Sequence, residues 1–340
     1  MDAVNAIPVH SKGAPAGGVD ELVRLSAADM QGVNALIAAR MASQVPVIPA
    51  LADHLIAAGG KRLRPLLTVA AARLAGSTDE ACLKLAAAVE FIHTATLLHD
   101  DVVDSSKLRR GKVAAHLIWG APSSVLVGDF LFARAFELMV ETGSLRALQI
   151  LAKASSVIAE GEVLQLTRAH DLNLDQATYL EIIQAKTAEL FAAAAESGAV
   201  SAGVDETRIA ALRAYGLKLG LAFQLADDAL DYGGATETLG KNAGDDFREG
   251  KATLPLLLGI ARSGPRETAF WERVIGRLEQ TDADFRRARE LIVGVGALEA
   301  TLDLAADYTA GAKAALAAFP ANPWRTALED LADFAVSRSA

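Results

Sequence analysis

The stretch LLHDDVVDSSKLRRGK, Leu97–Lys112, ends an apolar run with three carboxylates and follows them at once with basic residues. The acids are Asp100, Asp101 and Asp104. Positions i and i+4 share one face of a helix, so the spacing predicts that Asp100 and Asp104 point the same way. Like charges one turn apart repel each other, and folding alone does not require them. A bound cation would remove that repulsion.

The same spacing returns in QLADDALD, where the acids are Asp227, Asp228 and Asp231. Mg²⁺ prefers a few carboxylates together with waters and substrate phosphates. Two such clusters on two apolar helices could face each other and hold a diphosphate between them through bridging metal ions. The alternative for either cluster is a solvated acidic helix end, but two copies favour metal binding.

The rest of the chain has a helical pattern. Hydrophobic residues make up 52% of the 340 residues, but aromatic residues only 5%, and many of the apolar residues are alanines, the strongest helix formers. There is no convincing strand alternation and no fixed repeat. We therefore expect one all-α domain, residues 19–340, with roughly ten or more helices, behind a flexible Gly- and Pro-containing lead-in, residues 1–18.

Several helix boundaries can be predicted from capping residues and breakers. One helix should start within Ser77–Glu80 and run to about Asp104, and Gly120–Ser124 should form a turn before the next apolar helix. Two further helices are expected from Asn173 or Asp175 to about Glu196, and from near Asp205 to Gly233.

Bulk charge and cysteine content exclude some functions. The net charge of −9 argues against nonspecific nucleic-acid binding, which needs a basic face. The single cysteine, Cys82, lies in an apolar helical pattern and is expected to be a small buried hydrophobe in a reducing compartment. No targeting segment and no transmembrane helix are expected, which favours the cytoplasm.

Basic residues gather at four places, although each cluster alone could be a solvated basic face. Diphosphate binding is favoured by their position beside acids and glycines, since Arg and Lys bind phosphate well. The clusters are Lys61, Arg62 and Arg64 in GGKRLRP; Arg109, Arg110 and Lys112 in KLRRGK; Lys186 with Thr187 in AKT; and Lys241 and Lys251 in LGKNAGDDFREGKATLP.

These segments, together with FQLADDALDY, resemble the ordered motif set of the trans-isoprenyl diphosphate synthases, or polyprenyl synthetases, over about Gly59–Pro255. The resemblance implies the all-helical isoprenoid synthase fold with a deep central cavity, three Mg²⁺ ions and a homodimer. It also implies two diphosphate substrates, isopentenyl diphosphate and an allylic diphosphate such as farnesyl diphosphate.

The resemblance assigns roles position by position. It implies that Mg²⁺ is bound by Asp100, Asp104, Asp227 and Asp231, with Asp101 and Asp228 beside them as further catalytic residues. It implies that isopentenyl diphosphate is bound by Lys61, Arg64, His93 and Arg110, and the allylic diphosphate or its surroundings by Arg109, Lys186, Thr187, Gln224, Lys241 and Lys251, with Lys186 also catalytic. From the residue pattern alone, His93 would more often be a core histidine. The role of His99 stays open.

Product length is expected to depend on the helix face before Asp100. Ile92, Ala95 and Thr96 lie there, and Ala95 and Thr96 are small where short-chain relatives carry aromatic residues. The tunnel should therefore continue for at least one more turn. The resemblance implies a long-chain enzyme that makes a quinone side chain of roughly forty to fifty carbons, a length that helix geometry permits.

Other functions compete with this interpretation. A shorter-chain, geranylgeranyl-type synthase would share every motif. A terpene cyclase of the same fold would keep one aspartate motif, and a non-catalytic subunit of a heteromeric synthase would have lost acids or cations. A structural helical scaffold would leave the paired motifs unexplained. A peripheral membrane contact would help to release a long product.

Overall fold

The computed structural model describes residues 19–57, 62–109, 111–233, 244–281 and 283–337, apart from the side chain of residue 52. The predicted lead-in, residues 1–18, and the predicted ligands Lys61, Arg110 and Lys241 lie outside these described residues.

The described chain is helical apart from one short hairpin. The α-helices are α1 (Asp20–Met41), α2 (Val47–Ala57), α3 (Leu63–Leu74), α4 (Ala81–Val103), α5 (Ala115–Trp119), α6 (Ala121–Glu141), α7 (Leu145–Thr167), α8 (Gln176–Ile183), α9 (Glu189–Ser201), α10 (Glu206–Gly233), α11 (Asp245–Glu249), α12 (Leu254–Arg262), α13 (Thr268–Trp271), α14 (Asp284–Gly294), α15 (Ala297–Ala315) and α16 (Pro323–Ser337). Two π-helical turns, η1 (Gln184–Ala188) and η2 (Glu272–Gly276), and a 3₁₀ turn, η3 (Leu316–Ala318), complete the helical elements. The strands are β1 (Leu108–Arg109) and β2 (Lys112–Val113).

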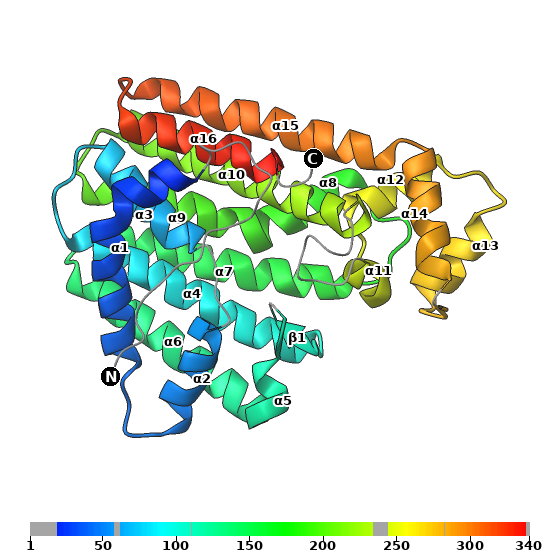
Figure 1. The fold of residues 1–340 in the computed structure, drawn as a ribbon, viewed down its shortest axis with the longest axis horizontal. Coiled ribbons are helices and arrows are strands. Elements are labelled where there is room, and N and C mark those ends of the chain that lie inside the picture. Colours follow the sequence, from blue (N-terminus) through cyan, green and yellow to red (C-terminus); the bar gives the residue numbers. More distant parts are fainter. Residues whose placement is uncertain (1–18, 58–61, 110, 234–243, 282, 338–340) are drawn as a thin grey trace.

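The long helices form a bundle with α9 and α10 near its middle (Figure 1). Helix α10 packs on α9 along one side and on α15 and α16 along another, while α4 packs between α3, α6 and α9. The short helices α11–α14 gather at one end of the bundle, at the carboxyl end of α10 (Figure 1). The predicted all-α fold is confirmed.

Small residues allow α9 and α10 to pack closely. A Cβ on Gly216 would lie 2.3 Å from the Phe191 carbonyl oxygen, and one on Gly220 would lie 2.6 Å from the Ala188 Cα. Any larger side chain at either position would force the helices apart. This close contact sets the distance between the Lys186–Thr187 segment and the second aspartate motif on α10.

Several predicted boundaries agree with the structure. Helix α4 ends at Val103 with Asp104 as its C-cap, and α10 runs from Glu206 to Gly233. Of the two predicted caps for α8, the structure uses Asp175, whose side chain accepts a hydrogen bond from the Thr178 N–H at 2.7 Å.

Three features differ from the predictions. The expected turn at residues 120–124 is shorter, because α6 already begins at Ala121, and proline is well tolerated in a first helical turn. The helix expected to continue to Glu196 is interrupted by the π-turn η1. The hairpin β1–β2 was not expected; it pairs Leu108 with Val113 and Arg109 with Lys112. Two-residue strands are too short to show alternation in a sequence.

Among the described helices, α4 is long and apolar enough to cross a membrane by length and composition alone, with a mean hydropathy of 1.5. In the fold, 56% of the apolar 18-residue stretch of α4 that has this hydropathy is buried. Core helices of folded proteins pass the same test, and α4 is surrounded by α1, α3, α6 and α9.

Candidate active site

The first aspartate motif lies at the carboxyl end of α4. Asp101 is 1% exposed, and its Oδ1 accepts hydrogen bonds from the Arg109 guanidinium, through Nε at 2.8 Å and through Nη2. Arg109 reaches back because β1 and β2 turn the chain, with the Ala114 N–H donating to the Lys107 carbonyl at 3.0 Å. The first arginine after the acids in sequence thus pairs with the middle acid, Asp101.

Asp100 is the acid of this motif that faces other helices. Lys186 Nζ lies 4.0 Å from Asp100 Oδ2 and donates to Glu162 Oε2 on α7 at 2.7 Å. Burial raises the pKa of the Asp100 carboxyl to about 7; Lys186 opposes the rise, and the neighbouring Glu162 and Asp104 add to it. Asp100 therefore lies among carboxylates and one lysine in a buried setting that disfavours its charged form, and a bound cation would offset that penalty.

In the second motif the middle acid is again the buried one. Asp228 is 3% exposed, and its two oxygens accept from Gln224 Nε2 at 2.7 Å and from the Tyr179 hydroxyl at 2.5 Å. Burial raises the pKa of Asp228 to about 7, against these two hydrogen bonds, which lower it. Asp227, the residue before it on α10, is half-buried.

Asp231 has a local structural contact. Its carboxylate accepts hydrogen bonds from the backbone N–H groups of Gly244, Asp245 and Asp246, at 3.1, 3.2 and 3.1 Å. Burial raises the pKa of Asp231 although these three donors lower it. Asp231 thereby fastens the start of α11 to the end of α10, and any cation it bound would share it with the backbone.

Besides Arg109 and Lys186, two further predicted ligands, Arg64 and Lys251, lie at separate places. Arg64 Nη1 is 3.1 Å from His93 Nε2, and the Arg64 guanidinium lies 4.4 Å from the centre of the Phe191 ring. Lys251 pairs with Glu249 at 2.5 Å and lies 3.9 Å from Asp246 Oδ1. Burial lowers the pKa of Lys251, but the two carboxylates outweigh burial and raise it, so Lys251 stays charged.

Thr187 links the Lys186 segment to α10. Its hydroxyl donates to Gln224 Oε1 at 2.9 Å. Lys186 and Thr187 lie in the π-turn η1, a rare element that often marks functional sites. A Cβ on Gly161 of α7 would lie 2.7 Å from the Ala185 Cβ and 3.1 Å from the Lys186 nitrogen, so this glycine permits the π-turn to pack against α7.

The predicted chain-length residues lie on α4 before the first motif. Ile92 and Ala95 are fully buried, and Thr96 is half-buried, with its hydroxyl donating to the His93 carbonyl at 2.8 Å. His99, whose role the sequence left open, contacts α6: its Nε2 lies 3.1 Å from the Val125 carbonyl oxygen, over Gly128.

Sequence reasoning missed three residues of this region. Glu162 pairs with Lys186, Tyr179 donates to Asp228, and the half-buried Asp246 lies 3.9 Å from Lys251. Glu162 and Tyr179 are far in sequence from their partners, whereas Asp246 is close to Lys251. A possible signal for Glu162 was its neighbour Gly161, a glycine inside a helical pattern.

The donor set fits Mg²⁺. The acids offer carboxylate oxygens, the ligands that hard cations prefer, and Asp100 lies close to the carboxylates of Glu162 and Asp104. The described residues contain no group of three or more His, Cys, Asp and Glu side chains already gathered for a metal ion. Mg²⁺ commonly uses one or two carboxylates and completes its shell with water and substrate phosphate.

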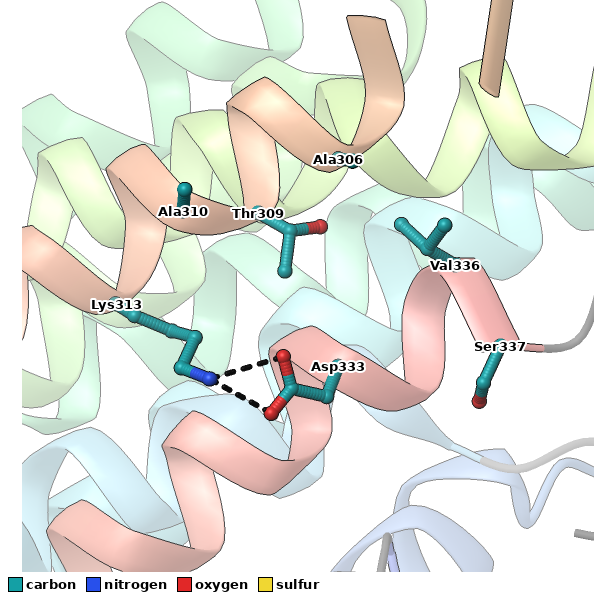
Figure 2. Close-up of a pocket in the computed structure, with 7 residues that line it drawn as sticks. All are labelled: Ala306, Thr309, Ala310, Lys313, Asp333, Val336 and Ser337. Atoms are coloured by element: carbon teal, nitrogen blue, oxygen red, sulfur yellow. Dashed lines mark hydrogen bonds and ion pairs between the residues drawn. The ribbon is translucent and has the colours of Figure 1, made fainter. Parts of the chain in front are cut away.

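A groove between α15 and α16 does not belong to this site. Figure 2 shows it lined by Thr309, Lys313 and Asp333 among others, with Lys313 Nζ paired to Asp333 at 2.7 Å. Lys218 of α10 donates to the neighbouring Gly311 carbonyl, and Lys218 lies about two and a half turns before Asp227. The groove therefore lies away from the second aspartate motif.

The fold and the site define a prenyltransferase. The site has two aspartate motifs in an all-helical bundle, a lysine between carboxylates, and further arginine and lysine side chains. The family model of polyprenyl synthetases matches residues 45–292, and the chain belongs to this family, the trans-isoprenyl diphosphate synthases. The resemblance is to the long-chain type, as the sequence predicted.

Named relatives agree. The chain is 44% identical over 322 residues to the octaprenyl diphosphate synthase of Escherichia coli strain K12, covering 94% of this chain and 99% of that one. A polyprenyl synthase structure from Caulobacter crescentus, complexed with calcium and isoprenyl diphosphate, is 80% identical with a TM-score of 0.93, over 96% and 100% of the two chains. A decaprenyl diphosphate synthase structure from Rhodobacter capsulatus is 53% identical with a TM-score of 0.91, over 94% and 99%.

Proposed function

We propose that this enzyme adds isopentenyl diphosphate repeatedly to an allylic diphosphate, such as farnesyl diphosphate, in a Mg²⁺-dependent reaction. The product proposed is a prenyl chain of eight to ten isoprene units, matching the octaprenyl and decaprenyl names of similar proteins. The observation that carries the proposal is the pair of aspartate motifs, each with a buried, anchored middle acid and a less buried first acid, with Lys186 beside the first of them.

The residues account for the chemistry without a side-chain nucleophile. Lys186 and Lys251 supply positive charge that stabilises the allylic diphosphate as it departs. The Arg64–His93 pair supplies charge for the diphosphate of isopentenyl diphosphate. Asp100, Asp104, Asp227 and Asp231 would hold Mg²⁺, which would supply further charge stabilisation. The allylic carbocation is then attacked by the double bond of isopentenyl diphosphate, and a proton is lost to the released diphosphate.

A product assay tests the proposal. Purified protein is incubated with Mg²⁺, farnesyl diphosphate and labelled isopentenyl diphosphate, and the chains are sized after phosphate is removed. We expect one long-chain peak that is lost in Asp100→Ala. A product of twenty carbons would favour the geranylgeranyl-type alternative; one geranylgeranyl diphosphate synthase, from Methanosarcina mazei, is 37% identical to this chain. No product from folded protein would favour a non-catalytic subunit.

We also propose a homodimer. The outer face of α6 exposes an apolar stripe that includes Leu126, Phe136 and Val140, which are 66%, 41% and 64% exposed. Burying such a stripe against a second copy would remove apolar surface from water. Sedimentation of the wild type and of Val140→Glu tests this: we expect a dimer that the charged variant dissociates.

The proposed setting is the cytoplasm, with a quinone side chain as the use of the product. The described cysteine, Cys82, is free and buried, which suits a reducing compartment. A prenyl chain of this length is insoluble in water, so its release calls for peripheral contact with a membrane. Fractionation of cells that express the tagged protein tests both points.

A further inference from the structure

The middle acid of the second motif, Asp228, is held by neutral hydrogen-bond donors and not by cations. Asp228 is 3% exposed, and a buried carboxylate without partners is costly. Among the residues that the structure describes, no Lys or Arg forms an ion pair with it. Its two oxygens instead accept hydrogen bonds from neutral donors on two helices, the Tyr179 hydroxyl on α8 at 2.5 Å and the Gln224 amide on α10 at 2.7 Å.

The hydrogen bonds of Asp228 determine the orientation of the Gln224 amide. Because Gln224 Nε2 donates to Asp228, its Oε1 is left as an acceptor, and the Thr187 hydroxyl donates to it at 2.9 Å. Three hydrogen bonds therefore run from Tyr179 through Asp228 and Gln224 to Thr187. They connect α8 and α10 to the π-turn that carries Lys186.

Tyr179 itself has no access to a substrate. It is 2% exposed and packs in an apolar cluster with Ile183, Leu225 and Leu254. Its hydroxyl can act on the site only through Asp228, whose neighbour Asp227 lies about 100° further around the same helix.

We propose that Tyr179 is a positioning residue, whose buried hydroxyl orients Asp228 and, through Asp228 and Gln224, sets Thr187 and Asp227 for the diphosphate. The inference rests on the proposed function, because it assumes that this face binds the allylic diphosphate.

The test compares two tyrosine-to-phenylalanine variants on full-length protein. Tyr179→Phe removes the hydroxyl that faces Asp228. Tyr215→Phe is the matched control: Tyr215 is fully buried on α10, and its hydroxyl donates to the Leu328 carbonyl at 2.6 Å, away from the second motif. Both variants lose one buried hydrogen bond and should lower Tm similarly.

Two measurements separate the two variants. Calorimetry measures the binding of inorganic pyrophosphate in the presence of Mg²⁺, and steady-state kinetics measure kcat/KM. We expect Tyr179→Phe to weaken pyrophosphate binding and lower kcat/KM for the allylic diphosphate by about 10- to 100-fold, while Tyr215→Phe changes neither. If Tyr179→Phe loses only thermal stability, as the control does, the proposal is wrong. A wild type that binds pyrophosphate but makes no prenyl chain would count against the proposed function alone.

A double variant keeps the test decisive if Tyr179→Phe folds poorly. Asp228→Asn removes the buried charge, so Tyr179→Phe/Asp228→Asn should fold. If Tyr179 acts through Asp228, the double variant should bind pyrophosphate as weakly as Asp228→Asn alone, because coupled residues are not additive. Two independent, multiplied losses would overturn the proposal.

Discussion

At the scale of the residue, the three acids of each motif have different surroundings. The middle acids, Asp101 and Asp228, are buried and held by protein donors, whereas Asp100 keeps a half-buried carboxylate near Lys186. Helical spacing predicted that Asp100 and Asp104 share a face. The Tyr179 partner of Asp228 could not be predicted, because these two residues are 49 positions apart and meet only in the folded bundle.

The raised pKa of Asp100 predicts a pH-dependent stability without ligand. A carboxyl whose pKa is higher in the folded state loses stability as pH rises from its ordinary value near 3.8 to about 7. Asp100→Asn should remove this loss and stabilise the ligand-free protein by up to about 4 kcal/mol at pH 8, and by a smaller amount, about 1–2 kcal/mol, at pH 5.

Thermal unfolding between pH 5 and pH 8 measures this. Asp303→Asn, at an exposed position on α15, is the control and should follow the wild type. Parallel Tm curves for the wild type and Asp100→Asn would contradict the prediction.

At the scale of the element, the hairpin β1–β2 and the π-turn η1 place the cations. Neither was predicted, because two-residue strands carry no alternation and a five-residue π-turn is too short for its period to show in a sequence. The capped helices α8 and α10 were predicted because their caps are local, since Asp175 and Asp205 accept from N–H groups three residues later. Features made by chain segments meeting in space were the ones that local pattern could not predict.

Removing the cation that holds Asp101 should destabilise the end of α4. In Arg109→Met the buried Asp101 carboxylate loses its ion pair, which we expect to lower the free energy of unfolding by about 3–5 kcal/mol. Urea unfolding checks this. Adding Asp101→Asn to Arg109→Met should restore part of the loss, because no charge is then left buried; an equal or larger loss in the double variant would contradict the reason given.

The close contact of α7 with the π-turn predicts a sensitive glycine. Gly161→Ala places a Cβ 2.7 Å from that of Ala185 and should lower the free energy of unfolding by about 1–3 kcal/mol, with a loss of activity as Lys186 shifts. Gly294→Ala, at a helical glycine whose Cβ would meet nothing within 4 Å, should be neutral or slightly stabilising. Denaturant melts and the product assay compare the two, and equal effects would rule out the packing argument.

At the scale of the whole molecule, the all-helical fold was predictable from the sequence, whereas the packing order of the helices was not. Alanine-rich, apolar segments of helical period predicted the all-α fold, and the ordered motifs predicted the family. The order in which helices pack is set by contacts such as those of Gly216 and Gly220 with α9. A single sequence marks such glycines but does not show which neighbour they touch.

The position of Ala95 on buried α4 leads to a prediction about product size. Ala95→Phe should block the product tunnel that we expect beside α4 and shorten the main product, since a ring replaces a fully buried methyl group. Chain lengths are compared by chromatography. Ala312→Phe, at a fully buried alanine on α15, controls for overpacking and should lower stability but keep the product length. Full-length product from Ala95→Phe would remove Ala95 from the tunnel floor.

The different anchors of the two middle aspartates have a consequence for behaviour in salt. Asp101 is held by Arg109, a charged side chain that is 28% exposed, whereas Asp228 is held by neutral donors inside the core. Dissolved ions weaken a partly exposed ion pair but have little effect on buried neutral hydrogen bonds. Rising ionic strength should therefore loosen the end of α4, while the end of α10 keeps its shape. The second motif should tolerate concentrated salt, and the first motif should not.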